Sequence, residues 1–188
     1  MRILFSVLFS LLLAAWSLPA RAQDEADGST FDQKTILHEA EMFFGDASAS
    51  IAKVIEKAFD DHGRPNAYIL GSEAGGAIVF GGRIGKGVLK HKVFGDADVH
   101  WIGPSIGLDF GGDASKVFML VYHLPDIDSI YKRYFGVDGS FYFVGGVSLN
   151  YRQKGEVILA PIRTGVGLRA GVSGGYIKFT KRRTMFPF

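Results

Sequence analysis

The sequence predicts a mainly β protein: a small soluble antiparallel β-barrel of about nine or ten strands, with two N-terminal helices and one short inserted helix. Three observations support this fold class. Short β-prone runs follow one another from Tyr68 to Thr180. Of the 25 glycines, 22 lie between Gly71 and Gly175, a density that coiled, closely packed strands tolerate and helices do not. Two amphipathic helical patterns precede the first strand.

The N-terminus has the features of a secretory signal peptide. Arg2 precedes an apolar run from Ile3 to Trp16, and Ala20-Arg21-Ala22 forms a cleavage pattern before Gln23. We expect export and cleavage after Ala22, because a membrane anchor would need about 20 apolar residues. Residues 23–30 are acidic, small and polar, and we expect a disordered leader there. Residues 31–188 are predicted to form a single helix-flanked β-barrel domain.

The predicted mature chain is formally neutral. The full sequence carries 21 Lys and Arg against 19 Asp and Glu, and removal of residues 1–22 takes away Arg2 and Arg21. A surface that captures nucleic acid usually has a strong basic excess, so no nucleic-acid partner is expected. The sequence contains no cysteine, which excludes disulfides, thiol catalysis and cysteine-based metal sites.

Helical periodicity predicts two helices before the barrel. Apolar residues of the first recur at helical spacing up to a stop at Gly45: Ile36, Leu37, Ala40, Phe43 and Phe44. The second follows an Asp46 or Ser48 cap and ends at Gly63, and its apolar stripe comprises Ile51, Val54, Ile55, Ala58 and Phe59. Its polar face mixes both charges, which favours packing against the barrel over binding to a membrane surface.

Turn residues divide the rest of the chain into short strands. The expected strands cover residues 68–70, 77–83, 87–93, 99–102, 106–110, 116–123, 140–151, 156–161, 165–172 and 176–180. A short helix from Pro125 to about Phe135 is expected between two of them, with acidic residues at its start and basic residues at its end. The pairs Gly81-Gly82 and Gly145-Gly146 indicate bends, bulges or close backbone contacts within strands. Closing the sheet into a barrel would remove its exposed edges.

Three segments match motifs of catalysis or nucleotide binding, but each lacks the required context. Gly103-Pro104-Ser105-Ile106-Gly107 matches the nucleophile elbow of α/β-hydrolases, which needs a helix after the serine, whereas Leu108 to Gly112 is not helical in pattern. Residues 165–170 match G-x-G-x-x-A without a following helix, and residues 81–87 lack the Walker spacing. We therefore expect no catalytic residues, no cofactor and no cofactor-binding residues. A serine hydrolase is kept as a further alternative.

One group of residues has the spacing of metal ligands. Asp96, Asp98 and His100 would share one face of an extended strand. Three ligands on a single strand rarely converge without help from elsewhere, so a polar hairpin tip is the favoured interpretation and no metal site is expected. Five aromatic residues are predicted to fill the barrel and its contact with the helices: Tyr122, Tyr131, Phe141, Phe143 and Tyr176. A minority of them could line a ligand mouth.

Several separated segments, in order, resemble one protein family. They are residues 63–69, Trp101 with Gly103-Pro104-Ser105, Leu120-Val121-Tyr122 with Leu124, residues 136–140, Val144-Gly145-Gly146, residues 161–163 with 165–167, Gly175-Tyr176 with residues 178–180, and Pro187-Phe188. Together they resemble the envelope integrity protein A family of alphaproteobacteria over nearly all of residues 31–188. Ile102 and Met185-Phe186 depart from that family's pattern. The glycine-rich stretch Ala74–Leu89 is more weakly similar to the lipid-binding SYLF domain.

The family resemblance implies a small soluble β-barrel in the periplasm of a Gram-negative cell that supports cell-envelope integrity and has no established catalytic residues. We expect a non-enzymatic protein that binds a lipid or glycolipid, or contacts an envelope-assembly partner, through residues that the sequence does not identify. The alternative is an integral outer-membrane barrel, which the C-terminal aromatics Phe186 and Phe188 would suit. Pro187 and the polar Arg182 and Thr184 argue against a lipid-facing last strand, and most predicted strands are shorter than the roughly 9–11 residues that cross a bilayer.

Overall fold

The computed structural model describes residues 28–45, 48–109, 115–164 and 175–183. The predicted signal peptide and most of the predicted leader lie outside these ranges. Two helices, seven strands and one 3-10 turn follow one another: α1 (Gln33–Phe44), α2 (Ala49–His62), β1 (Ala67–His91), β2 (Gly95–Asp109), β3 (Ser115–Tyr122), η1 (Asp128–Ile130), β4 (Arg133–Val144), β5 (Val147–Lys154), β6 (Val157–Thr164) and β7 (Tyr176–Thr180).

Both helices begin and end where local chemistry favours it. The side chain of Asp32 accepts a hydrogen bond from the Thr35 backbone N–H at 2.8 Å, and that of Ser48 accepts one from Ile51 at 3.3 Å. Gly45 ends α1 in the left-handed conformation, with φ 79°. The two predicted helices are therefore confirmed. No helix in the described ranges is long and apolar enough to cross a membrane.

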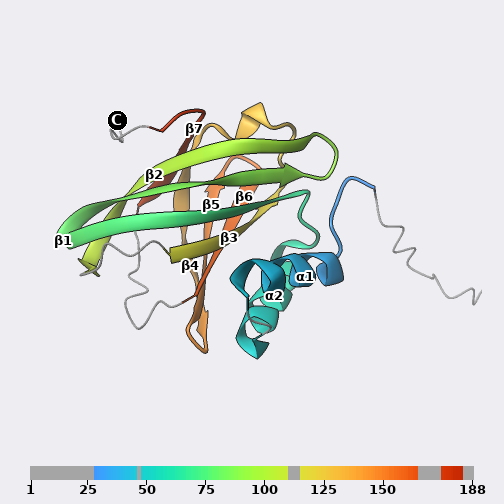
Figure 1. Cartoon of the computed structure of the whole chain (residues 1–188), viewed down its shortest axis with the longest axis horizontal. Helices are drawn as coiled ribbons and strands as arrows, with labels where there is room; N and C mark the ends of the chain where they lie inside the picture. The colour runs from blue at the N-terminus through green and yellow to red at the C-terminus, as the bar shows by residue number, and fades with distance from the viewer. Residues whose placement is uncertain (1–27, 46–47, 110–114, 165–174, 184–188) are drawn as a thin grey trace, which may run out of the picture.

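The strands form a closed antiparallel barrel in the order β1-β2-β7-β4-β5-β6-β3. The long β1 folds back on itself, so that its first arm pairs with β3 and its second arm with β2 (Figure 1). The arms lie side by side: the Lys92 N–H donates to the Asn66 carbonyl at 3.0 Å, and a Cβ built on Gly87 would lie 2.8 Å from the Gly71 Cα. Counting the two arms separately, the barrel has eight strands.

The barrel is thus confirmed, with fewer and longer strands than the sequence predicts. The runs predicted at residues 68–70, 77–83 and 87–93 all belong to β1, and those at 99–102 and 106–110 fall largely within β2. The predicted helix from Pro125 to Phe135 is reduced to the 3-10 turn η1, because residues from Arg133 onward pair with β7 in the barrel wall. The strand predicted at 165–172 lies outside the described residues.

Gly145 and Gly146 do not bend a strand as predicted; they form the two-residue turn between β4 and β5. Val144 pairs with Val147 across this turn, and the two glycines have φ 52° and 83°. Positive φ at both central residues is the geometry of a type I′ turn, which suits the twist of a hairpin. A Cβ on Gly145 would also collide with Ser50 of α2, so this turn packs directly against the helical layer.

Successive side chains of a strand point to opposite faces of the sheet, so the barrel wall has a hydrophobic core on each of its two faces. One lies outside the barrel wall, where both helices cover β3, β5 and β6, and it includes Ile36, Ile55, Tyr68, Phe118, Leu120, Tyr122, Leu149 and Ile162 (Figure 1). The other fills the barrel and includes Ile69, Leu89, Val99, Trp101, Met119, Val121, Leu159 and Phe179. Tyr122 joins the helices to the wall by donating a hydrogen bond to the Ala58 carbonyl at 3.0 Å.

The β4–β5 turn provides a test of how the helical layer docks. Gly145→Val should lower the free energy of unfolding by well over 1 kcal/mol, because the side chain meets both an unfavourable φ and Ser50. Gly146→Val is the matched control, since Gly146 has the same positive φ but nothing within 4 Å of its Cβ position. Urea unfolding of both variants measures the difference. Equal losses of stability would show that the turn does not contact α2.

Candidate functional site

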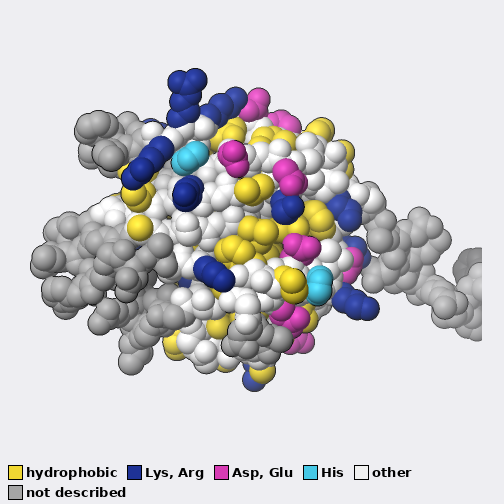
Figure 2. Space-filling view, in the orientation of Figure 1, with side chains coloured by type: hydrophobic (Ala, Val, Ile, Leu, Met, Phe, Trp, Pro, Cys, Tyr) yellow, Lys and Arg dark blue, Asp and Glu magenta, His cyan; other side chains and the backbone are white. Residues whose placement is uncertain are grey.

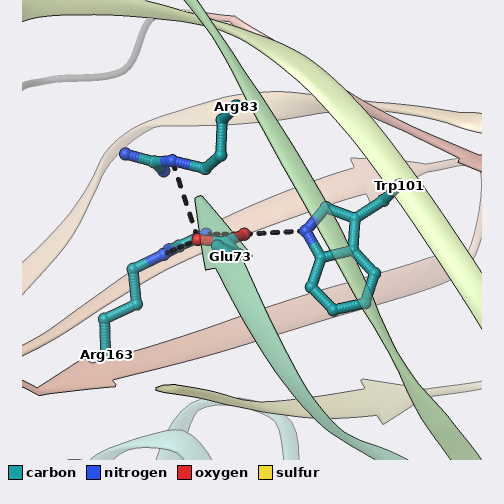
Figure 3. A network of polar contacts seen from close by, with 4 residues as sticks. All are labelled: Glu73, Arg83, Trp101 and Arg163. Carbon is teal, nitrogen blue, oxygen red and sulfur yellow. Dashed lines mark hydrogen bonds and ion pairs between the residues drawn. The ribbon is translucent and has the colours of Figure 1, made fainter. Parts of the chain in front are cut away.

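A layer of charged side chains lies within the barrel, centred on Glu73 of β1 (Figure 3). The Glu73 carboxylate is 2% exposed and receives two hydrogen bonds from Arg163 of β6, from Nε at 2.8 Å and from Nη2 at 3.0 Å. The Nε1 of Trp101 donates a third at 2.8 Å, and the Nε of Arg83 lies 3.6 Å from the same carboxylate. One carboxylate thus joins both arms of β1 to β2 and β6.

The Trp101 ring reaches Glu73 because β1 presents glycine beneath it. A Cβ on Gly71 would lie 2.5 Å from the Trp101 Cη2 atom, closer than any real side chain approaches. The ring is 2% exposed and packs against Phe179 of β7, with 5.7 Å between ring centroids. Glycine in this part of β1 therefore makes room for the indole that orients the buried acid.

The surroundings of Glu73 keep it ionised. Burial alone would raise its pKa, but the charge and hydrogen bonds of Arg163, with those of Arg83 and Trp101, outweigh burial and lower the pKa to about 2. Glu73 is therefore a carboxylate throughout the physiological range. A carboxylate bound in this way joins the strands as a charged anchor.

Arg152 of β5 is a further buried cation near this layer, and it is 2% exposed. Its Nη1 donates to the Gly175 carbonyl at 2.7 Å. Burial, together with the neighbouring Arg163 and Arg83, lowers the pKa of Arg152 to about 10. The guanidinium is still charged at neutral pH, but that charge is less favourable here than in water.

A pocket opens beside Arg152, between β4, β5 and the start of β7. Its volume is about 350 Å³, and it is lined by Phe135, Gly136, Val137, Asp138, Gly139, Ser140, Phe141, Asn150, Gly175 and Tyr176. Phe135 is 49%, Val137 38% and Phe141 42% exposed. An exposed apolar rim on a hollow that also offers a carboxylate, a hydroxyl and an amide is a feature of binding sites.

An irregularity of β4 creates the pocket. The β4–β5 register shifts between Gly136 and Phe141, and Gly139 has φ 71°. The hydroxyl of Ser140 fixes the displaced loop by donating to the Val137 carbonyl at 2.6 Å and accepting from the Tyr151 N–H at 3.2 Å. Such a bulge interrupts strand pairing and redirects side chains, and bulges are frequent next to functional sites.

Comparison with known proteins identifies the family. Residues 29–188 match the sequence profile described as envelope integrity protein A. The chain belongs to the envelope integrity protein A family. A crystal structure of a beta-barrel-like, uncharacterized protein from Brucella abortus is similar, with 46% identity and a TM-score of 0.78 over 85% of this chain and 99% of that one. A search of the curated proteins found no match.

Three segments that carry the resemblance to the envelope integrity protein A family contribute to the charged layer or to the pocket. Trp101 and Arg163, the latter from the segment 161–163, both bind Glu73. The segment 136–140 forms the pocket's bulged side. The pocket and the charged layer were not predicted, because Glu73 and Arg163 are 90 residues apart in sequence and nothing local links them.

The catalytic and nucleotide-binding matches do not take the shapes that their motifs require. The backbone of Ser105 lies within β2, paired with Gly81 of β1, so this segment does not form a strand–turn–helix elbow. Residues 81–87 are likewise part of β1 and not a phosphate-binding loop. The G-x-G-x-x-A match at 165–170 lies outside the described residues.

The possible metal ligands lie along β2. Asp96, one of the three residues with the spacing of metal ligands, forms an ion pair with Lys90 at 3.0 Å. Within the described residues no group of three His, Asp or Glu side chains is placed to hold a metal ion.

The aromatic side chains divide between core and surface. Tyr122 is buried under α2, as predicted for the helix contact. Phe141 and Tyr176 line the pocket instead of the barrel core, and Phe143 is 39% exposed. The prediction of an interior position is therefore wrong for Phe143, whereas Phe141 and Tyr176 belong to the minority of aromatics that the prediction allowed at a pocket.

The charged layer makes stability depend on acid pH. The pKa of Glu73 is lowered from 4.5 to about 2 on folding, so its contribution is present above pH 4.5 and is lost as the pH falls towards 2. A difference of this size corresponds to on the order of 3 kcal/mol. Glu73→Gln should therefore be much less stable than the wild type at pH 7, and the gap should narrow towards pH 2.

Urea unfolding across this pH range measures the gap. Asp126→Asn is the control, because Asp126 is an exposed acid whose pKa is lowered chiefly by the Ser129 N–H. If Glu73→Gln were as stable as the wild type at pH 7, the ion-pair network would contribute nothing to the fold.

Proposed function

We propose that this member of the envelope integrity protein A family is a soluble, non-enzymatic periplasmic protein that binds a lipid or glycolipid in the pocket between β4 and β7. The observation that carries the proposal is the exposed apolar rim formed by Phe135, Val137 and Phe141. Apolar side chains gathered around a hollow favour a ligand that is itself partly apolar. The family is described by envelope integrity, and lipids and glycolipids are components of the cell envelope.

The size and polar groups of the pocket indicate which part of the ligand it would hold. A volume of about 350 Å³ is at the small end of ligand sites, so it would take a head group and the first part of a chain. Asp138, Ser140 and Asn150 supply hydrogen-bond acceptors and donors of the kind that hydroxyl groups need. The flat rings of Phe135, Phe141 and Tyr176 suit the apolar faces of a sugar or the start of an acyl chain.

The packing of the barrel supports a soluble protein over the outer-membrane alternative. Two helices cover the outer face of β3, β5 and β6, whereas the outer face of a membrane barrel contacts lipid. The interior is filled by side chains such as Trp101, Met119 and Leu159 and is not a polar channel. On the face seen in Figure 2, basic and acidic side chains are interspersed with hydrophobic ones, as is usual for a surface in water.

The non-enzymatic part of the proposal is supported by the pocket's chemistry. Its titratable residues among those described are Asp138 and Tyr176, and the Tyr176 ring lies 4.4 Å from the Arg133 guanidinium. Glu73, a buried acid outside the pocket lining, has a lowered pKa because of Arg163 and Arg83 and is ionised. These groups suit binding better than acid–base or covalent chemistry.

Substitution on the rim tests the binding site. Val137→Asn should weaken binding of the neutral apolar probe N-phenyl-1-naphthylamine about fivefold, because a buried apolar contact is lost. Val93→Asn is the matched control: Val93 is 59% exposed in the β1–β2 turn and does not line the pocket. Probe fluorescence, followed by displacement with a lysolipid, gives the affinities. Equal binding by both variants would place any lipid site elsewhere.

A further inference from the structure

Basic side chains gather where β7 ends and β4 begins. The segment from residue 175 to residue 183 contains no acidic residue and four basic ones: Lys178, Lys181, Arg182 and Arg183. Lys132 lies beside them, because its carbonyl accepts a hydrogen bond from the Phe179 N–H at 3.0 Å. These five basic residues are called the basic surface below. Figure 2 shows Lys and Arg side chains gathered at the upper left, where Figure 1 places β7 and the chain that follows it.

The basic surface lies on the outside of the barrel. Ile177 and Phe179 are buried in the barrel core, so Lys178 between them points to the outer face. The other four members are exposed: Lys132, Lys181, Arg182 and Arg183. The two helices pack on β3, β5 and β6, which are other strands of the wall. The cations are therefore accessible to a partner that approaches β7 from outside.

Acidic side chains of the protein neutralise only part of the basic surface. Lys181 forms an ion pair with Asp128 at 2.7 Å, and Lys132 is close enough to Asp126 to act on its charge. Within the described ranges three members form no ion pair: Lys178, Arg182 and Arg183. Their charges are left to attract an anionic partner.

Aromatic rings lie among the cations. The Nζ of Lys181 is 5.2 Å from the ring centroid of Tyr131. Phe135 pairs with Tyr176, two residues before Lys178 in β7, and the two ring centroids are 6.1 Å apart. Phe135 is 49% exposed. Aromatic rings beside basic side chains are typical of protein surfaces that contact the head-group region of a lipid bilayer.

The charge of the helical layer has the opposite sign. The described part of residues 32–64 carries six acidic and four basic residues. The predicted mature chain is formally neutral, so its charges are segregated and not merely in excess. A negatively charged surface would attract the β7 end of the molecule and not the helical layer, which gives the encounter a preferred orientation.

We infer that the basic surface docks the protein on an anionic lipid bilayer. Lys178, Arg182 and Arg183 lie at the lipid phosphates, and the Phe135 ring enters the head-group boundary. A soluble polyanion would match the charges but would give Phe135 no apolar contact. Docking is an additional interaction beyond the pocket ligand proposed above, because none of the five basic residues lines the pocket.

Vesicle flotation tests the inference. The mature protein should bind vesicles of equal parts phosphatidylglycerol and phosphatidylcholine about tenfold or more tightly than vesicles of phosphatidylcholine alone. Raised salt should release it, because salt screens exposed charges. Arg182→Gln combined with Arg183→Gln should weaken binding to the anionic vesicles by about tenfold or more, whereas Arg182→Lys combined with Arg183→Lys should keep it. Both arginines are exposed beyond β7, so these variants should fold.

Two further variants separate the basic surface from general charge and from polyanion binding. Lys34→Gln combined with Lys53→Gln removes two exposed cations of the helical layer and should leave vesicle binding unchanged. Phe135→Ser should weaken vesicle binding several-fold and leave binding of inorganic polyphosphate unchanged. The double arginine variant should still bind N-phenyl-1-naphthylamine, because neither arginine lines the pocket, so docking and pocket binding can fail separately.

The remaining outcomes contradict the inference. Equal binding to the two kinds of vesicle, or binding to neither, would overturn docking on an anionic bilayer. Equal losses in the arginine and lysine double variants would show that total charge decides and that the basic surface does not. Unchanged vesicle binding by Phe135→Ser would indicate a site for polyanions in general and not for a lipid surface.

Discussion

The ion-pair network around Glu73 is the constraint on which the rest of the barrel depends. Its partners come from the second arm of β1, from β2 and from β6, so the carboxylate joins segments that meet only when the barrel closes. The network needs the indole of Trp101 in place, and the indole in turn needs glycine beneath it at Gly71.

The helical layer and the pocket lie on different parts of the wall. The helices cover β3, β5 and β6, and the Tyr151 hydroxyl donates to Asp61 of α2 at 2.7 Å. The same residue's N–H donates to Ser140, which fixes the bulge of β4. Tyr151 thus connects the helical layer with the pocket's edge, and a rigid support of this kind holds a binding site in one shape.

Local signals in the sequence predicted the helices and the fold class, because helix caps, glycine stops and the spacing of apolar residues are short-range features. Ser48, Gly45 and Gly63 act as their residue types suggest. Prediction failed where pairing partners decide the outcome. The segment after Pro125 has helical end signals, yet Tyr134 pairs with Ile177 and becomes strand. The pocket depends on a register shift and on β7, about forty residues later in the chain, so no local pattern indicates it.

The central claim is that the protein holds a lipid or glycolipid in the pocket between β4 and β7. The most direct measurement is a native mass spectrum of the protein released from its own periplasm by osmotic shock, without detergent. The account predicts a chain that begins at Gln23 and carries an additional mass which, after extraction, proves to be a lipid or glycolipid. A spectrum of the chain alone would contradict it.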